Sequence, residues 1–181
     1  MSVLAVRASI VQQLQATLPP GVQVLAHGGR FDSAEEIKRY VTKGPTVLVS
    51  CMRIPLSTPG TARVMLPAGW AIFVITKDVP GAPRDQGAIA LVEAVLLQIN
   101  SNLWGRTDVM VPSAIESRNL YSSKVDNLGV ALWAITFTQM VTDLAVDTST
   151  LNNFVTFHED IDMAPADGQI DITQTTELPQ E

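Results

Sequence analysis

The residues best suited to nucleophilic or metal chemistry are few and far apart in the sequence. The chain holds two histidines, His27 and His158, and one cysteine, Cys51. A thiol nucleophile needs an adjacent base and partial exposure, whereas Cys51 lies in the apolar run 46–54. Neither histidine has an H-E-x-x-H or C-x-x-C companion of the kind that holds zinc. We therefore predict that Cys51 is a small buried strand residue and that each histidine is a loop or surface residue.

The strongest metal lead is the tetrapeptide DGQI at residues 167–170, which reproduces the middle of a calcium-binding loop. The rest of the loop is missing, because Met163 and Pro165 stand at the first two ligand positions and Gln174 stands where the bidentate Glu belongs. An Asp-Gly turn between two extended segments is the better interpretation. We expect no metal site and no cofactor.

Other functional motifs are missing as well. The sequence contains no G-x-x-x-x-G-K-[ST] phosphate loop, no G-x-G-x-x-G dinucleotide loop and no G-x-S-x-G nucleophile elbow. Asp85 precedes an apolar helical pattern, so we assign it to capping that helix. Trp70, Trp104 and Trp133 are assigned to core or interface packing. Since no acid, base and nucleophile come together, we expect no catalytic residue and no enzymatic activity.

Composition and charge place the chain among globular proteins. It has 181 residues, 46% apolar and 17% charged, enough for one hydrophobic core. Residues 1–142 hold 12 basic and 9 acidic side chains, a net charge of +3, and residues 143–181 hold 9 acidic and no basic ones, a net charge of −9. An acidic block is typical of a solvated tail or an arm that meets a partner. The weak basic excess of the body disfavours nucleic-acid binding, and no apolar run is long enough for a membrane span.

Hydrophobic periodicity predicts the order of the elements. Apolar residues three or four apart indicate amphipathic helices at 2–18 and 88–103, and Ser33 with Glu36 forms a capping box for a short helix ending near residue 42. Strands are predicted at 22–26, 46–54, 61–66, 70–77, 115–121 and 128–142, with a turn at 67–69. The fold class that follows is α+β, an antiparallel β-sheet with two long helices packed on one face. The long strand 128–142 is our candidate for an exposed sheet edge.

The last 39 residues carry scattered apolar positions among the acids. They are too apolar for a spacer and too polar for a core of their own. We therefore divide the chain into an α+β core domain at 1–142 and an extended acidic C-terminal arm at 143–181, which docks on a neighbouring subunit. The candidate subunit-interface residues are the arm's apolar anchors, Phe154, Phe157, Ile161, Ile170 and Ile172.

Four pieces of the sequence carry a resemblance to a known family. They are LPPGV at 18–22, WAIFVITK at 70–77 followed by RDQGAIALVEAVLLQI at 84–99, the pair Trp104-Gly105, and a long late strand leading to ADGQIDI at 166–172. Together they cover most of the chain. The pattern resembles the tail terminator, or tail completion, proteins of long-tailed phages, in particular the Mu-like branch.

The resemblance implies a structural virion protein that forms a hexameric ring, stops growth of the tail tube and presents a surface for the head or neck. The implied partners are further copies of this chain, the tail tube protein, and a head-to-tail connector or neck protein. DNA would pass through the channel without specific binding, and no membrane is involved. The protein would reside in the virion after assembly in the host bacterial cytoplasm. Two alternatives remain: another phage neck or tail-tube component, and a stand-alone small binding module.

Overall fold

The computed structural model describes two parts of the chain. The described residues are 2–31, 33–40, 42, 44–55, 65–79, 81, 83–120, 128–142, 156–161 and 172–177. The chain divides into two compact units, Met1–Val146 and Asp147–Glu181. Among the described residues, no helix is long and apolar enough to cross a membrane.

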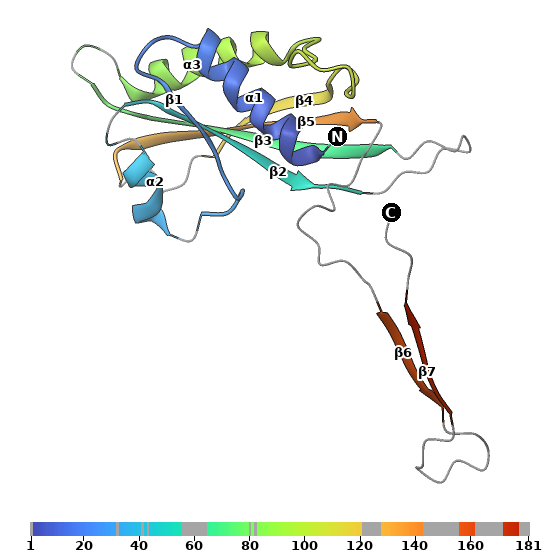
Figure 1. The fold of residues 1–181 in the computed structure, drawn as a ribbon. Coiled ribbons are helices and arrows are strands. Elements are labelled where there is room, and N and C mark those ends of the chain that lie inside the picture. Colours follow the sequence, from blue (N-terminus) through green and yellow to red (C-terminus); the bar gives the residue numbers. More distant parts are fainter. Residues whose placement is uncertain are drawn as a thin grey trace. The chain divides into compact units, whose positions relative to one another are not determined.

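The first unit is built on a five-stranded sheet with helices, which confirms the predicted α+β class (Figure 1). Its spatial order is β1-β2-β3-β5-β4. The strands are β1 (Gln23–Ala26), β2 (Thr46–Arg53), β3 (Leu66–Lys77), β4 (Ser113–Asn119) and β5 (Val130–Val141). The pair β1–β2 is parallel and the other pairs are antiparallel. The prediction of a wholly antiparallel sheet is therefore wrong, because the sheet is mixed.

The parallel pair follows from the short helix α2 (Ala34–Tyr40), which lies between β1 and β2 in the chain. A helix between two strands returns the chain to the end where the first strand began, so the second strand runs parallel to the first. The helix begins as the capping box predicts, since the Ser33 hydroxyl accepts a hydrogen bond from the Glu36 amide at 3.1 Å.

Two long helices, α1 (Val3–Thr17) and α3 (Arg84–Ile99), bury their apolar stripes in one core cluster with the sheet. The buried helix positions recur three or four residues apart, as the sequence predicts. They are Val6, Ile10 and Leu14 of α1 and Ala88, Leu91, Val92, Val95 and Ile99 of α3. The sheet contributes alternate residues such as Val49, Ile72 and Phe137. Figure 1 shows α1 and α3 over the same side of the sheet.

The intervening strand residues form a second, smaller cluster on the other face. Leu48, Phe73 and Leu132 belong to it, together with Ile37 of α2. Figure 1 shows α2 below the sheet. The helix has only seven residues, so it covers one part of this face, and Thr136 in the middle of β5 stays exposed.

The central strands β3 and β5 pair along their whole length, from Leu66 opposite Val141 to Lys77 opposite Val130. The predicted turn at 67–69 is therefore wrong, since these residues belong to β3. Pro67 lies beyond Gly69, where the pairing of β3 with β2 ends, a position at which a strand tolerates proline. The predicted strand at 61–66 falls largely outside the described residues.

The proposal that strand 128–142 is an exposed edge is also wrong. This segment forms β5, which lies between β3 and β4 in the interior of the sheet. Strand β4 precedes β5 in the chain and pairs antiparallel with it, so β4 occupies the outer position. The sequence pattern identified both strands and did not reveal which of them is outermost.

Helix α3 begins differently from the prediction as well. Its N-cap is Pro83, and Asp85 lies in the first turn, where its charge suits the helix dipole. The residue that binds the start of the helix is Asp78, whose carboxylate accepts a hydrogen bond from the Arg84 amide at 3.0 Å. Capping by Asp85 is therefore corrected to capping by Asp78.

The described residues of the second unit form two strands, β6 (Thr156–Ile161) and β7 (Ile172–Glu177), which pair antiparallel. In the register of this pair, Ile161 is opposite Ile172 and Phe157 is opposite Thr176. The predicted turn at 167–168 lies outside the described residues.

Candidate functional site

The two candidate residues for nucleophilic chemistry in the body are not brought together. Cys51 packs against the core cluster that contains α1 and α3. His27 packs against Phe31, Tyr40 and Phe73, which belong to the cluster on the opposite face of the sheet. The sheet therefore separates the thiol from the imidazole, and the pair cannot act as nucleophile and base.

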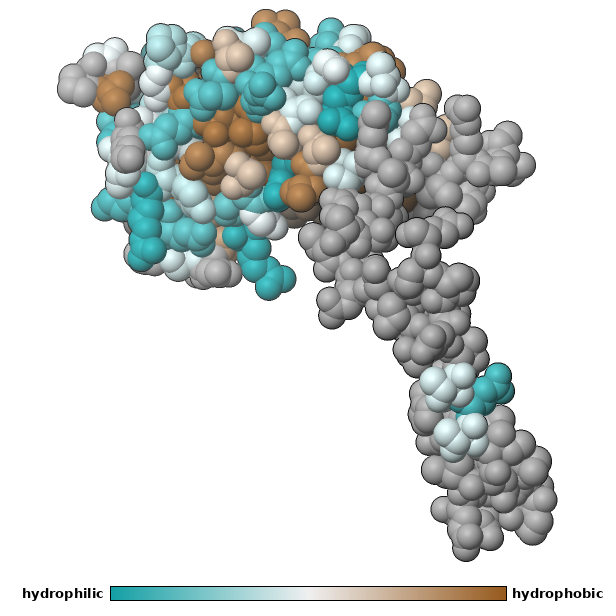
Figure 2. Space-filling view, viewed as in Figure 1, coloured by the Kyte–Doolittle hydropathy of each residue, from teal (hydrophilic) through white to brown (hydrophobic). Residues whose placement is uncertain are grey.

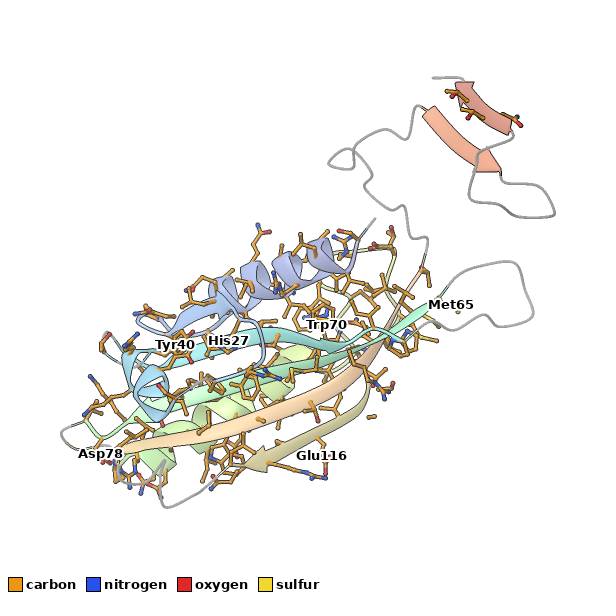
Figure 3. The ribbon with its side chains drawn as sticks, turned by 90° about the horizontal axis from the view of Figure 1, so that it is seen from below. His27, Tyr40, Met65, Trp70, Asp78 and Glu116 are labelled. Carbon is orange, nitrogen blue, oxygen red and sulfur yellow. The ribbon has the colours of Figure 1, made fainter. Side chains whose placement is uncertain are left out.

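His27 lies in the loop after β1, as predicted, but its side chain is only 7% exposed. Its ring stacks on Phe31 with 4.8 Å between centroids and meets Tyr40 edge-on at 5.5 Å. The Gly29 amide donates a hydrogen bond to His27 Nδ1 at 3.0 Å, and Nε2 lies 3.8 Å from a Glu36 carboxylate oxygen. Figure 3 shows His27 and Tyr40 close together beside α2. The loop position therefore agrees with the prediction, and the buried ring packs this loop against α2.

Cys51 is half-buried rather than fully buried. Burial raises the pKa of its thiol above the ordinary value, and the opposing influences of the Arg53 carbonyl and the Arg7 charge are smaller. A thiol with a raised pKa forms little thiolate at neutral pH, and the thiolate is the reactive form. The environment of Cys51 is that of a packing residue.

No group of three or more His, Cys, Asp or Glu side chains within the described ranges could hold a metal ion. The tetrapeptide at 167–170 lies outside those ranges, and His158 is placed in β6, opposite Thr175. The search for a metal centre therefore yields no candidate in the described part of the chain.

A shallow cavity of about 330 Å³ lies between α1 and the turn at Trp104. Its lining includes Ser9, Gln12 and Gln13 of the helix. These side chains are polar and uncharged, so the cavity offers no general acid or base.

The segment between α3 and β4 is held rigidly against β5 by buried hydrogen bonds. Gln139, which is fully buried, accepts a hydrogen bond from Trp104 Nε1 at 2.8 Å. Its amide donates to the carbonyl oxygens of Asn102 at 3.0 Å and Met110 at 2.7 Å. Trp104 is buried in the core, as are Trp70 and most of Trp133, so the packing role predicted for the tryptophans is confirmed.

An ion pair fixes the same segment a few residues further on. Arg106 donates two hydrogen bonds of 2.7 Å to the Asp108 carboxylate, and its guanidinium also reaches the Ser9 hydroxyl at 3.3 Å. Hydrogen bonding to Arg106 holds the pKa of Asp108 below its ordinary value, although burial acts in the opposite direction. The bidentate geometry joins the segment to α1.

The two edges of the sheet differ in how their backbone groups are used. At the β1 edge, the Gln15 side chain from α1 accepts a hydrogen bond from the Val24 amide at 2.9 Å and donates to the Val22 carbonyl at 3.2 Å. The carboxamide thus occupies backbone groups that another strand would otherwise bind. Figure 2 shows apolar side chains at the surface beside α1 and β1, and Leu25 of β1 is 42% exposed.

At the opposite edge, β4 pairs with β5 alone among the described strands. The strand and the residues just before and after it carry four exposed large apolar side chains, which we call the β4 edge surface: Met110, Val111, Ile115 and Leu120. Figure 3 shows Glu116 on this outermost strand. A bulge between Ser113 and Glu116 interrupts the pairing with β5, and Ala114 has a φ of 49° there.

No family model and no curated protein matches the chain. The surfaces that the fold presents are therefore the basis for assigning a function. The β4 edge surface is the candidate functional site, because exposed apolar side chains along a sheet edge are typical of a protein interface. Sequence reasoning missed it because the alternation in residues 113–119 is weak and the exposure depends on the position of β4 in the sheet.

The interface residues predicted in the C-terminal region fall partly within the described residues. Phe157 and Ile161 belong to β6, and Ile172 belongs to β7. Phe154 and Ile170 lie outside the described residues. The structure brings Ile161 and Ile172 together as a directly paired position of the two strands. The interface role of all five remains a prediction.

Proposed function

We propose that the protein is a structural virion protein, a tail terminator that forms a ring on the phage tail tube, ends its polymerisation and provides the joint to the head or neck. The observation that supports the proposal is the difference between the two edges of the sheet. One edge is capped by Gln15, and the other carries the β4 edge surface. A ring is built from subunits that meet head to tail through two different surfaces, and a sheet with unlike edges supplies such surfaces.

The resemblance described above supports this function at the level of the fold. Two long helices packed on one face of the sheet and an extended acidic arm at residues 143–181 complete the proposed subunit. Among the described residues, β6 and β7 form a two-stranded sheet, and such a sheet needs a further packing surface to be stable in water. Docking on a neighbouring subunit through Phe154, Phe157, Ile161, Ile170 and Ile172 would supply that surface.

The proposed partners are further copies of the chain in a hexameric ring, the tail tube protein, and a connector or neck protein. The net charge of −6 suits a channel through which DNA passes, because acidic walls do not retain phosphate groups. The protein would assemble in the host bacterial cytoplasm and remain in the virion. The role is structural and requires no cofactor.

The mass of the purified protein, measured by light scattering at several concentrations with and without the tail tube protein, tests the proposal. A six-subunit species, or one that forms only when tube protein is present, is the expected result. A monomer whose mass does not respond to concentration or to tube protein would refute the terminator function.

A single substitution links the mass measurement to the candidate site. Val111 is 57% exposed on the β4 edge surface, so Val111→Lys places a charge at the edge without disturbing the core. We expect loss of the ring with an unchanged unfolding midpoint. The matched control is Ile89→Lys on α3, where the side chain is 45% exposed, and this variant should retain the ring. If both variants form the ring equally well, the β4 edge surface is not the interface.

A further inference from the structure

A small apolar groove lies where α1 begins and β2 ends. Val3, Leu4, Arg7, Cys51 and Ile54 line it, and its volume is about 190 Å³. Leu4 is 65% exposed and Ile54 is 51% exposed, which is unusual for aliphatic side chains lining a shared concavity. Small-molecule sites usually measure about 300–1,000 Å³, so this space suits protein side chains better than a metabolite. We call it the α1–β2 groove.

Arg7 gives the α1–β2 groove a positive charge. Within the described part of the chain, Arg7 is in no ion pair with a carboxylate. Its guanidinium lies near enough to Cys51 to act on the thiol electrostatically. An apolar groove with a free arginine favours a segment that combines apolar and acidic side chains.

The C-terminal region of the chain has this chemistry. Residues 143–181 carry 9 acidic and no basic side chains. In β6, Phe157 and Ile161 flank His158, Glu159 and Asp160. Apolar residues next to carboxylates match both the lining and the charge of the α1–β2 groove.

The topology places the start of this region at the correct end of the sheet. Cys51 is paired with Trp70, and Trp70 is paired with Phe137, so β2 and β5 run in the same direction on either side of β3. Figure 1 shows the ends of β2 and β5 and the start of α1 at one end of the body. The 13 residues at 143–155 can span at most about 45 Å.

The strand order shows how far the segment must reach to enter the groove of a neighbouring copy. The groove belongs to the β1–β2 side of the sheet, whereas the chain leaves from β5, next to the β4 edge. In a head-to-tail row of subunits, the β4 side of one copy faces the β1 side of the next. At about 4.8 Å per strand, the end of β5 lies about 10 Å from its own β2 and about 15 Å from the β2 of that next copy, and residues 143–155 can span either distance.

We propose that the α1–β2 groove receives the acidic C-terminal segment of a second copy of this chain, centred on residues 157–161. Apolar side chains of the segment enter between Leu4 and Ile54, and a carboxylate pairs with Arg7. The assignment to a second copy rests on the proposed ring function. The match between groove and segment rests on the groove's own lining and charge.

Cys51 provides a direct probe because it lines the groove and is the chain's single cysteine. The experiment measures the alkylation rate of Cys51 in the full-length protein over a wide range of protein concentration. Each rate is divided by that of the same protein at high dilution. Docking by a second copy predicts that the relative rate falls several-fold as concentration rises.

Three full-length variants should abolish this concentration dependence or weaken it. Leu4→Asp removes an apolar contact and should weaken docking about tenfold or more. Arg7→Glu reverses the groove charge and should weaken it about fivefold or more. The triple variant Glu159→Gln, Asp160→Asn, Asp162→Asn removes the acids from the segment. The matched controls are Leu97→Asp on α3 and Arg39→Glu on α2, both at exposed positions, which should behave like the wild type.

A relative rate independent of concentration in the wild type would overturn the proposal. Protection that is present even at high dilution and is lost in the triple variant would assign the groove to the chain's own segment, and would also overturn it. If raising the protein concentration still protects Cys51 in the triple variant, another surface covers the groove, and the proposal is wrong.

Light scattering on the same samples separates this proposal from the ring function. A six-subunit species with freely reactive Cys51 would refute groove docking and leave the terminator function standing. Concentration-dependent protection in a species that is only a dimer, with or without tube protein, would support groove docking and refute the ring.

Discussion

The buried carboxamide of Gln139 gives the sharpest test of how the β4 edge surface is positioned. The variant Gln139→Leu keeps the side-chain volume nearly constant and removes both the acceptor and the donors. Three groups then lose their partner: the Trp104 indole N–H and the carbonyl oxygens of Asn102 and Met110. The substitution therefore tests the hydrogen bonds rather than the packing.

The expected loss can be worked from these three contacts. A buried polar group left without a partner costs about 1–3 kcal/mol. The indole N–H is in the core and belongs at the upper end, whereas the two carbonyl oxygens are partly buried and belong at the lower end. The added apolar burial of leucine offsets roughly 1 kcal/mol. We expect the free energy of unfolding to fall by about 4 kcal/mol, which lowers the urea midpoint by about 2 M.

Urea unfolding followed by far-UV circular dichroism measures the change. Gln86→Leu is the matched control, because Gln86 is exposed on α3, and its effect should stay within about 0.5 kcal/mol. A midpoint for Gln139→Leu that equals the control would refute the claim that this network holds the segment between α3 and β4. The same variant should also lose the ring, since Met110 is both a hydrogen-bond partner of Gln139 and part of the β4 edge surface.

Two further predictions concern the ion pair and the capped edge. The depressed pKa of Asp108 means that its pairing with Arg106 stabilises the fold above the unfolded-state value of 3.8 and is lost as pH falls below it. Asp108→Asn should therefore show a smaller loss of stability than the wild type between about pH 5 and pH 3, measured by urea unfolding. Gln15→Leu leaves the Val24 amide and the Val22 carbonyl unpaired, so it should lower stability by about 1–2 kcal/mol and increase self-association in light scattering. Wild-type acid sensitivity in the first variant, or wild-type mass and midpoint in the second, would contradict the assigned roles.

The sequence predicted the helices and strands in which buried apolar residues recur at a regular spacing. Helices α1 and α3 and strand β5 each bury one regular stripe. The predicted ranges of α1 and β5 match the observed ones within two residues, whereas α3 begins and ends four residues earlier than predicted. The capping box at Ser33 is a local signal and was also confirmed. Such features depend on residues close in sequence, so a single chain reveals them.

Features that depend on distant partners could not be predicted in this way. The wholly antiparallel sheet and the edge position of residues 128–142 were wrong because strand neighbours are chosen by the tertiary fold. The turn at 67–69 was wrong because Gly69 still pairs with Arg53 of β2, and Pro67 fits inside β3 just beyond the end of that pairing. Asp78 replaced Asp85 at the start of α3 because the loop returns it to the Arg84 amide.

The candidate sites also depend on residues that are distant in the sequence. The α1–β2 groove joins residues from the first turns of α1 to the end of β2, and no local pattern connects them. Arg7 was the one available signal, since it is a charged residue on a helix that otherwise meets the sheet with an apolar stripe. The β4 edge surface could be recognised only after β4 was known to be outermost.

The unlike edges of the sheet also decide between two kinds of assembly. If β4 edge surfaces of two copies met each other, the contact would be isologous, and the assembly would close as a dimer. The α1–β2 groove lies on the β2 side of the central strand β3, and the chain leaves from β5 on the other side of β3. A segment docked from copy to copy therefore makes a heterologous contact. A heterologous contact continues until the rotation between subunits closes a ring. Val111→Lys should therefore remove a dimer outright if the edges pair with each other. In a head-to-tail ring, the same variant should instead leave short open oligomers that still protect Cys51 from alkylation.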